Sequence, residues 1–192
     1  MKRIDKNAWT GPAALAAFLT LAATPALAHT GAGQVAGMAA GFAHPLTGLD
    51  HVLAMVAVGV LAAQQGGRAV WFVPAAFVAM IVAGAFLGVA GVALPFVELG
   101  IVGSVIVLGA VVAADRRMQL SAAMTLVGAL AVFHGHAHGT EMPVDANGLA
   151  YGTGFVLATA LLHVVGLGMA GAGRLGKPIV MRPHHDKFVV NQ

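Results

Sequence analysis

The sequence predicts an all-α integral membrane protein: a small bundle of about five transmembrane helices that remain after signal removal. The first observation is composition, because 59% of the 192 residues are hydrophobic and only 9% are charged, whereas soluble domains carry about 25% charged residues. The second is that apolar stretches longer than about 18 residues recur along the chain. The third is the 26 glycines, which suit membrane helices whose backbones approach through small residues.

The same composition excludes several classes of protein. The pI of about 9.8 does not indicate nucleic-acid binding, because the basic residues are scattered through the loops and the two ends. The chain has no cysteine, so it has neither disulfides nor thiolate metal sites. It also lacks a phosphate-binding loop of the GxxxxGK[ST] type, so we do not expect it to hydrolyse ATP itself.

Residues 1–28 are predicted to form a cleavable signal peptide. The basic segment KRIDK precedes an apolar stretch over 13–23, and Ala26-Leu27-Ala28 matches the small-x-small cleavage pattern. An uncleaved first transmembrane helix is the alternative. Cleavage after Ala28 would make His29 the new N-terminus, where its amine and imidazole together could chelate a metal ion. A disordered start without a metal role is the other interpretation of His29.

The transmembrane metal-transport domain is expected over 29–173, and charged or turn-rich points divide it. The expected crossings are 33–63, with a break at His44–His51, and then 69–91, 92–114, 120–138 and 148–173. A basic tail, 174–192, follows. Small residues four apart are expected to mark helix contacts, and the pairs are Gly37/Gly41, Gly84/Gly88 and Gly168/Ala172.

Basic residues predict the orientation, because Lys and Arg favour the cytoplasmic side of a membrane. With the mature N-terminus in the periplasm, five crossings place Arg68, Arg116, Arg117 and the basic tail in the cytoplasm. A full hairpin over 33–63 would turn these later basic loops outward, so we prefer one broken crossing. We therefore expect a multi-pass protein of the bacterial inner (cytoplasmic) membrane with a cytoplasmic C-terminus.

The first candidate site is HPLTGLDH, which places His44, Asp50 and His51 within an apolar segment. Pro45 disfavours a helical conformation at His44 and is well placed to begin a helix, so we expect the break at His44. Broken helices at membrane depth line cavities, and transporters use them for ion sites. A metal or proton role is therefore favoured over helix capping by His44 and a structural pair between Asp50 and His51.

The second candidate site is FHGHAHGTE. On a helix, His134, His138 and Glu141 fall at positions i, i+4 and i+7, which share one face, whereas His136 projects to nearly the opposite side. A histidine-rich surface loop that captures metal adventitiously is the alternative. The facing triplet favours a functional site, and the role of His136 stays open.

Two isolated residues complete the candidates. Glu98 is the only charge in its span, which favours a counter-ion or coordination role. His163 lies within the last apolar run, with Thr159 one turn earlier as a hydrogen-bond partner, and either support of the metal ligands or packing would explain it. Ionisable side chains at membrane depth mark ion or proton paths by default, and imidazole and carboxylate suit divalent first-row metals.

These motifs resemble those of the HupE/UreJ family of bacterial membrane proteins, which is associated with hydrogenase and urease systems. The family pattern H-x5-D-H matches His44, Asp50 and His51. The pattern F-H-G-x-A-H-G-x-E matches 133–141, with His136 and Thr140 at the variable positions. The resemblance extends over the whole mature chain. It implies a secondary permease for Ni²⁺, or for Co²⁺, that supplies nickel-enzyme maturation, so the ion would be a transported substrate and not a prosthetic group.

Under this hypothesis Glu141 and the second motif would capture the ion outside, and the first motif would form the inner step with help from Glu98. An intramembrane zinc-dependent hydrolase is one alternative, in which Glu98 or Glu141 would serve as base. A metal sensor or chaperone is another, with His184 and His185 of the tail handing metal on. The expected partners are a divalent metal ion and the lipid bilayer, without nucleic acid, while a metallochaperone or a homo-oligomer stays open.

Overall fold

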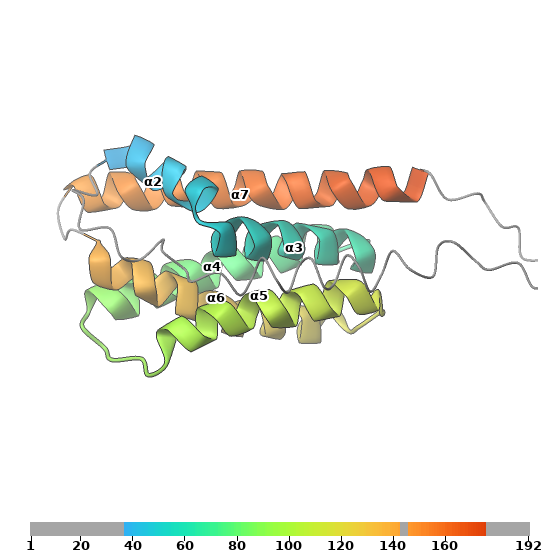
Figure 1. Cartoon of the computed structure of the whole chain (residues 1–192), viewed down its shortest axis with the longest axis horizontal. Coiled ribbons are helices and arrows are strands. Elements are labelled where there is room, and N and C mark those ends of the chain that lie inside the picture. Colours follow the sequence, from blue (N-terminus) through green and yellow to red (C-terminus); the bar gives the residue numbers. More distant parts are fainter. Residues whose placement is uncertain (1–36, 143–145, 176–192) are drawn as a thin grey trace, which may run out of the picture.

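The computed structural model describes residues 37–142 and 146–175, and every regular element in these ranges is an α-helix (Figure 1). The helices are α2 (Gly37–Thr47), α3 (Leu49–Gln65), α4 (Ala69–Val89), α5 (Val97–Ala114), α6 (Leu120–Glu141) and α7 (Ala146–Leu175). The predicted all-α class is confirmed. The predicted signal peptide, His29 and residues 176–192 of the basic tail lie outside the described residues.

Four of these helices, α4 to α7, are long and apolar enough to cross a membrane. Helices α2 and α3 pass the same test only together, and they bend by 80° at their break, so the chain has four candidate spans, or five if the bent pair is one span. The largest difference from the predicted limits is at the start of α5. Helix α5 begins at Val97 and not at residue 92, because Gly91, with a φ of 71°, and Pro95 hold the preceding segment in a non-helical linker.

Helices α4 and α6 share the most extensive helix contact. A Cβ atom added at Gly84 or Gly88 of α4 would collide with the backbone of α6, and one added at Gly135 or Gly139 of α6 would collide with the backbone of α4. The predicted contact at Gly84/Gly88 is therefore confirmed. The glycines of both helices interlock, so the two backbones approach as closely as helices in membranes do through small residues.

The other two predicted small-residue pairs make fewer helix contacts in the structure. Gly41 lies against the backbone of Tyr151 in α7. An added Cβ at Gly37, which begins α2 with a φ of 81°, would meet no atom of the described residues within 4 Å. The prediction for Gly168/Ala172 was wrong, because Gly168 also faces open space within the described structure and Ala172 is exposed. The spacing of small residues identifies a helix face without bulky side chains, but it does not show which neighbouring helix packs against that face.

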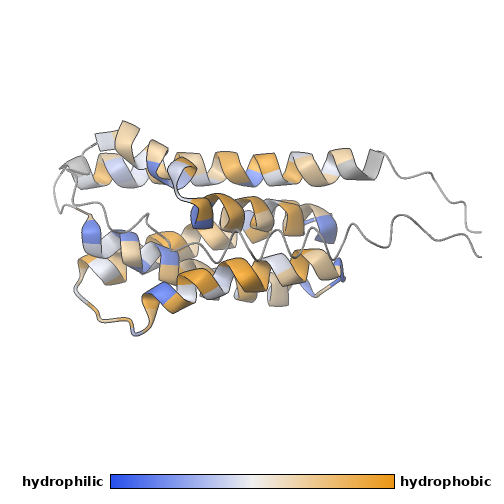
Figure 2. Ribbon diagram, viewed as in Figure 1, coloured by the Kyte–Doolittle hydropathy of each residue, from blue (hydrophilic) through white to orange (hydrophobic). Residues whose placement is uncertain are grey.

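The two linkers that carry the basic residues Arg68, Arg116 and Arg117 lie together at one end of the bundle. The buried Gln65 joins them: its side-chain amide donates to the carbonyl of Arg116 (3.1 Å) and its Oε1 accepts the backbone N–H of Met118 (2.9 Å). The Arg117 guanidinium donates to the Gln65 carbonyl. The C-terminal end of α7 points to the same end (Figure 1), and Figure 2 shows hydrophilic residues there and near the bend, with largely hydrophobic helices between.

Candidate metal centre

The bend between α2 and α3 creates the candidate site. The break lies at Gly48, within the predicted segment His44–His51 but not at His44 itself, and Pro45 is inside α2. The His44 carbonyl accepts both the backbone N–H of Gly48 (3.2 Å) and the hydroxyl of Thr47 (3.0 Å), which keeps the turn after the proline helical. Gly48 then adopts an extended conformation, and α3 starts in a new direction.

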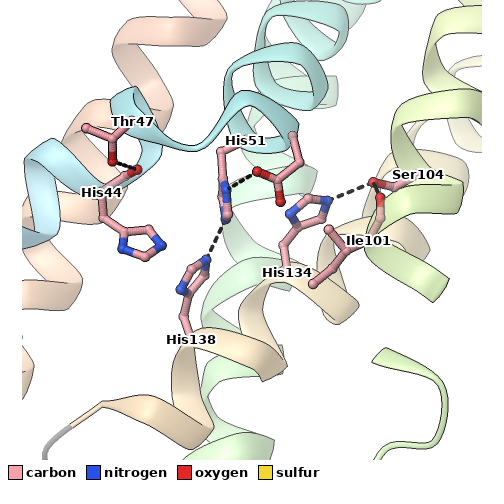
Figure 3. A network of polar contacts seen from close by, with 8 residues as sticks. His44, Thr47, His51, Ile101, Ser104, His134 and His138 are labelled. Atoms are coloured by element: carbon pink, nitrogen blue, oxygen red, sulfur yellow. Dashed lines mark hydrogen bonds and ion pairs between the residues drawn. The ribbon is translucent and has the colours of Figure 1, made fainter. Parts of the chain in front are cut away.

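The bend turns His44 of α2 and His51 of α3 toward His138 of α6 (Figure 3). One ring nitrogen from each residue lies within 4.8 Å of the others, and within the described ranges this is the one group with spacing suited to a metal ion. The three ring centroids are 4.7 to 5.4 Å apart. His51 and His138 are buried and His44 is partly buried. We call these residues the three-histidine cluster.

Asp50 orients one member of the cluster. Its Oδ1 lies 3.0 Å from Nδ1 of His51, and because a carboxylate only accepts, the ring must donate Nδ1–H. Nε2 of His51 is then an acceptor, and it lies 2.7 Å from Nε2 of His138. His138 therefore donates the proton between the two rings when no metal is present. A cation that entered the cluster would replace this proton, because metal ligands must be deprotonated.

His134 lies beside the cluster, with its ring centroid 5.3 Å from that of His51. Ser104 of α5 holds it: the serine hydroxyl lies 2.6 Å from the carbonyl of Ile101 and 2.7 Å from Nε2 of His134 (Figure 3). A hydroxyl has one proton, which it donates to the Ile101 carbonyl, so His134 donates Nε2–H to the serine. This contact fixes the tautomer of a buried imidazole next to the cluster, a role that outer partners of metal sites commonly have.

The other candidates of the second motif lie away from the cluster. Nε2–H of His136 donates to the carbonyl of Val92 in the linker before α5, at 2.7 Å. Its ring therefore points away from His134 and His138, as the helical spacing predicted. Glu141 is exposed as the last residue of α6. Glu98 is exposed in the first turn of α5, and no hydrogen bond or ion pair joins it to another described residue.

His163 of α7 is also outside the cluster. It is buried, with its ring centroid 5.3 Å from that of Phe77 in a T-shaped contact. The predicted hydrogen bond from Thr159 was wrong, because the Thr159 hydroxyl donates to the carbonyl of Phe155 one turn earlier (2.9 Å). Neither ring nitrogen of His163 has a hydrogen-bond partner among the described residues.

Aromatic residues of α7 enclose the cluster, and sequence reasoning missed them. The Phe155 ring centroid lies 4.4 Å from that of His138 and 6.0 Å from that of His51, and Tyr151 lies 6.1 Å from His44. Aromatic residues within an apolar run give no sign in the sequence that they lie beside a metal site. Their spacing of four residues, on the face of α7 that also holds His163, is the pattern that indicates a shared role.

A cavity of about 580 Å³ reaches the cluster from the side of the bundle, between α4, α6 and α7. Its walls are largely apolar, and they include the exposed side chains of Phe86 and Leu157. His138 and Tyr151 form part of the lining. One histidine of the cluster, His138, therefore borders a cavity outside the packed core.

Comparison with known proteins agrees with these features. The sequence profile of the family described as HupE / UreJ protein matches residues 16–184, a range that contains both motifs. The chain is also 48% identical over 160 residues to a curated relative, Protein HupE of Rhizobium leguminosarum bv. viciae, and the match covers 83% of each chain. No solved structure matches the chain.

Proposed function

The chain belongs to the HupE/UreJ family, and from this premise we propose that it is a secondary permease for Ni²⁺, with Co²⁺ as the alternative ion. It would carry the ion across the bacterial inner membrane to supply the maturation of hydrogenase or urease. The observation that carries the proposal is the three-histidine cluster. Ligands from two distant motifs meet there, inside a bundle of helices long and apolar enough to cross a membrane.

The chemistry of the cluster suits a transported ion. Imidazole nitrogens bind nickel well, and the chain has no cysteine thiolate that would favour softer metals. A permeating ion must bind strongly enough to enter and weakly enough to leave. Three neutral imidazoles meet both needs, because water can complete the coordination and protonation of a ring releases the metal. Coupling of transport to protons follows as part of the proposal.

The three-histidine cluster supports a different order of events from the one expected from the sequence. The sequence predicted an outer capture step at the second motif and an inner step at the first, but His138 of the second motif lies in the same cluster as His44 and His51. We therefore assign capture and binding to one position. Glu98 lies in the first turn of α5 and Glu141 ends α6, both at the end of the bundle away from the basic linkers (Figure 1). Exposed carboxylates at this end of the bundle would raise the local concentration of cations before they bind.

The zinc hydrolase alternative has less support. Three histidines can hold zinc with an open position for water, but hydrolysis also needs a base beside that water. Asp50 is the carboxylate next to the cluster, and it accepts the hydrogen bond from His51. Glu98 and Glu141, the expected bases, are exposed and outside the cluster. The sensor alternative relies on His184 and His185, which lie outside the described residues.

Uptake of radioactive nickel tests the proposal in bacterial cells that lack their own nickel importers. We expect wild type to accumulate nickel above an empty-vector control, and His44→Ala, His51→Ala and His138→Ala each to lower uptake at least about tenfold, because each removes a ligand. His136→Ala is the matched control, since it alters a histidine on α6 that points away from the cluster. Uptake is compared per amount of protein in the membrane, and an excess of Co²⁺ shows which ion is preferred.

Two outcomes would contradict the proposal in different ways. Wild-type uptake no higher than that of the empty vector would refute the transport function. Equal uptake by wild type and all three cluster variants would refute the assignment of the site.

A further inference from the structure

Another buried imidazole, that of His163 in α7, lies outside the three-histidine cluster. Its relative exposure is 2%, and both ring nitrogens lack a hydrogen-bond partner among the described residues. Buried polar groups are almost always hydrogen-bonded, because an unpaired one loses its interaction with water without compensation. An apolar side chain of similar size would avoid that cost. The imidazole at this position therefore requires a reason other than packing.

The position of His163 relative to the cluster supplies that reason. Tyr151, Phe155, Thr159 and His163 are spaced four apart on one face of α7, and all four are buried. Phe155 packs against His138 and His51 of the cluster. His163 lies two helical turns farther along α7, roughly 12 Å along its axis, in the direction of the end where the basic linkers gather.

The ring of Phe77 lies between the three-histidine cluster and His163. Phe77 of α4 is fully buried, and its ring centroid lies 6.4 Å from that of His134, beside the cluster, and 5.3 Å from that of His163. An ion that left the cluster toward the basic end would pass this ring before it reached His163. The face of an aromatic ring attracts cations, so a cation that passed over the face of Phe77 would meet no electrostatic repulsion.

The backbones of α3 and α7 approach closely at the level of His163. A Cβ atom added at Gly59 of α3 would collide with the backbone carbonyl of His163, and one added at Gly166 would collide with the backbone of α3. A cation that moved through so tightly packed a region would have to lose water, and a protein ligand would have to replace it. A neutral imidazole supplies a lone pair of the kind that nickel and cobalt accept.

We infer that His163 is a second binding position for the transported divalent cation, between the three-histidine cluster and the cytoplasmic end. The inference rests on the proposed transport function and adds the path by which the ion leaves the cluster. His163 would bind the partly dehydrated ion through one ring nitrogen, and water would complete the coordination. Ions would thus pass between two positions, of which the cluster binds more tightly because it offers three ligands.

The test separates transport from binding at the cluster. His163→Leu keeps an apolar group of similar size but removes the ligand. We expect nickel uptake to fall at least about tenfold, as for loss of a metal ligand, while purified protein titrated with nickel chloride keeps the affinity of the cluster within about twofold. The melting temperature should stay equal or rise, because an unpaired buried polar group is removed.

A second pair of variants isolates the ligand role. Cysteine and serine have nearly the same shape, but only cysteine offers a good nickel ligand. We expect His163→Cys to transport nickel several-fold faster than His163→Ser. This pair also decides the matter if His163→Leu fails to reach the membrane.

Three results would overturn the inference. Wild-type uptake by His163→Leu would show that the residue only packs. A loss of cluster affinity in that variant would show that His163 acts through the cluster and not as a separate position. Equal uptake by the cysteine and serine variants would contradict a ligand role. All three leave the transport proposal intact, which would fail only if wild type itself accumulated no nickel.

Discussion

Replacing Asp50 with asparagine removes a charge beside the three-histidine cluster without changing the shape of the side chain. In the structure, Oδ1 of Asp50 accepts Nδ1–H of His51 at 3.0 Å, so Nε2 of His51 presents its lone pair to the cluster. An asparagine can instead present its NH₂ group to Nδ1. The proton of the ring would then move to Nε2, where it would occupy the position of the metal ion.

The size of the effect follows from the burial of this pair. Loss of a partner that orients a metal-binding histidine costs about 10- to 100-fold in metal affinity, which corresponds to roughly 1.4 to 2.7 kcal/mol of binding free energy. The Asp50 side chain is 11% exposed and His51 is fully buried, so little water can replace the lost hydrogen bond. We therefore expect Asp50→Asn to weaken nickel binding by about 100-fold, the upper end of this range.

Isothermal titration calorimetry of the purified protein with nickel chloride measures this change. Asp115→Asn is the matched control, because Asp115 is exposed at the opposite end of the bundle. Its left-handed backbone, with a φ of 44°, also accepts asparagine readily. The control should bind nickel like wild type. An affinity of Asp50→Asn within about twofold of wild type would refute the reasoning, because the orientation of His51 would not depend on the carboxylate.

Two further predictions concern α6. Gly135→Ala should lower the free energy of unfolding by about 1–3 kcal/mol, because the added Cβ collides with the backbone of α4, whereas Gly168→Ala should not, since it meets open space. Thermal melting in detergent measures both variants, and equal melting temperatures would contradict the close helix contact. His136→Phe should cost about 0.5–1.5 kcal/mol of stability by losing its hydrogen bond to the carbonyl of Val92, and it should bind nickel with unchanged affinity. A tenfold loss of affinity would instead place His136 in the metal site.

Local physical rules were enough to predict the helices and much of the candidate list. Long apolar runs allow little except helices across a membrane, so the limits of α4, α6 and α7 lie close to the predicted spans. Helical spacing also predicted that His136 points away from His134 and His138, because a rotation of 100° per residue applies wherever the helix packs. The break lies within the predicted segment His44–His51, but at Gly48 and not at His44 itself, since rules for proline do not include the two hydrogen bonds that the His44 carbonyl accepts.

The contacts of single buried side chains could not be predicted in this way. Thr159 has the right spacing to reach His163, but its hydroxyl donates to the carbonyl of Phe155 in its own helix. Ser104 gave no signal in the sequence, although it fixes the tautomer of His134. Each outcome depends on which acceptor lies nearest in the folded bundle, and a sequence pattern does not contain that distance.

By itself the sequence determined that this is a helical membrane chain with imidazoles and carboxylates at two motifs, because hydropathy and helical periodicity act over neighbouring residues. Only the tertiary structure decided which of these side chains meet. His51 and His138 are 87 positions apart in the chain, yet their Nε2 atoms lie 2.7 Å apart. The 80° bend at Gly48 and the glycine contacts between α4 and α6 bring them together, and such long-range packing selects three histidines as a cluster while leaving His136, His163, Glu98 and Glu141 outside it.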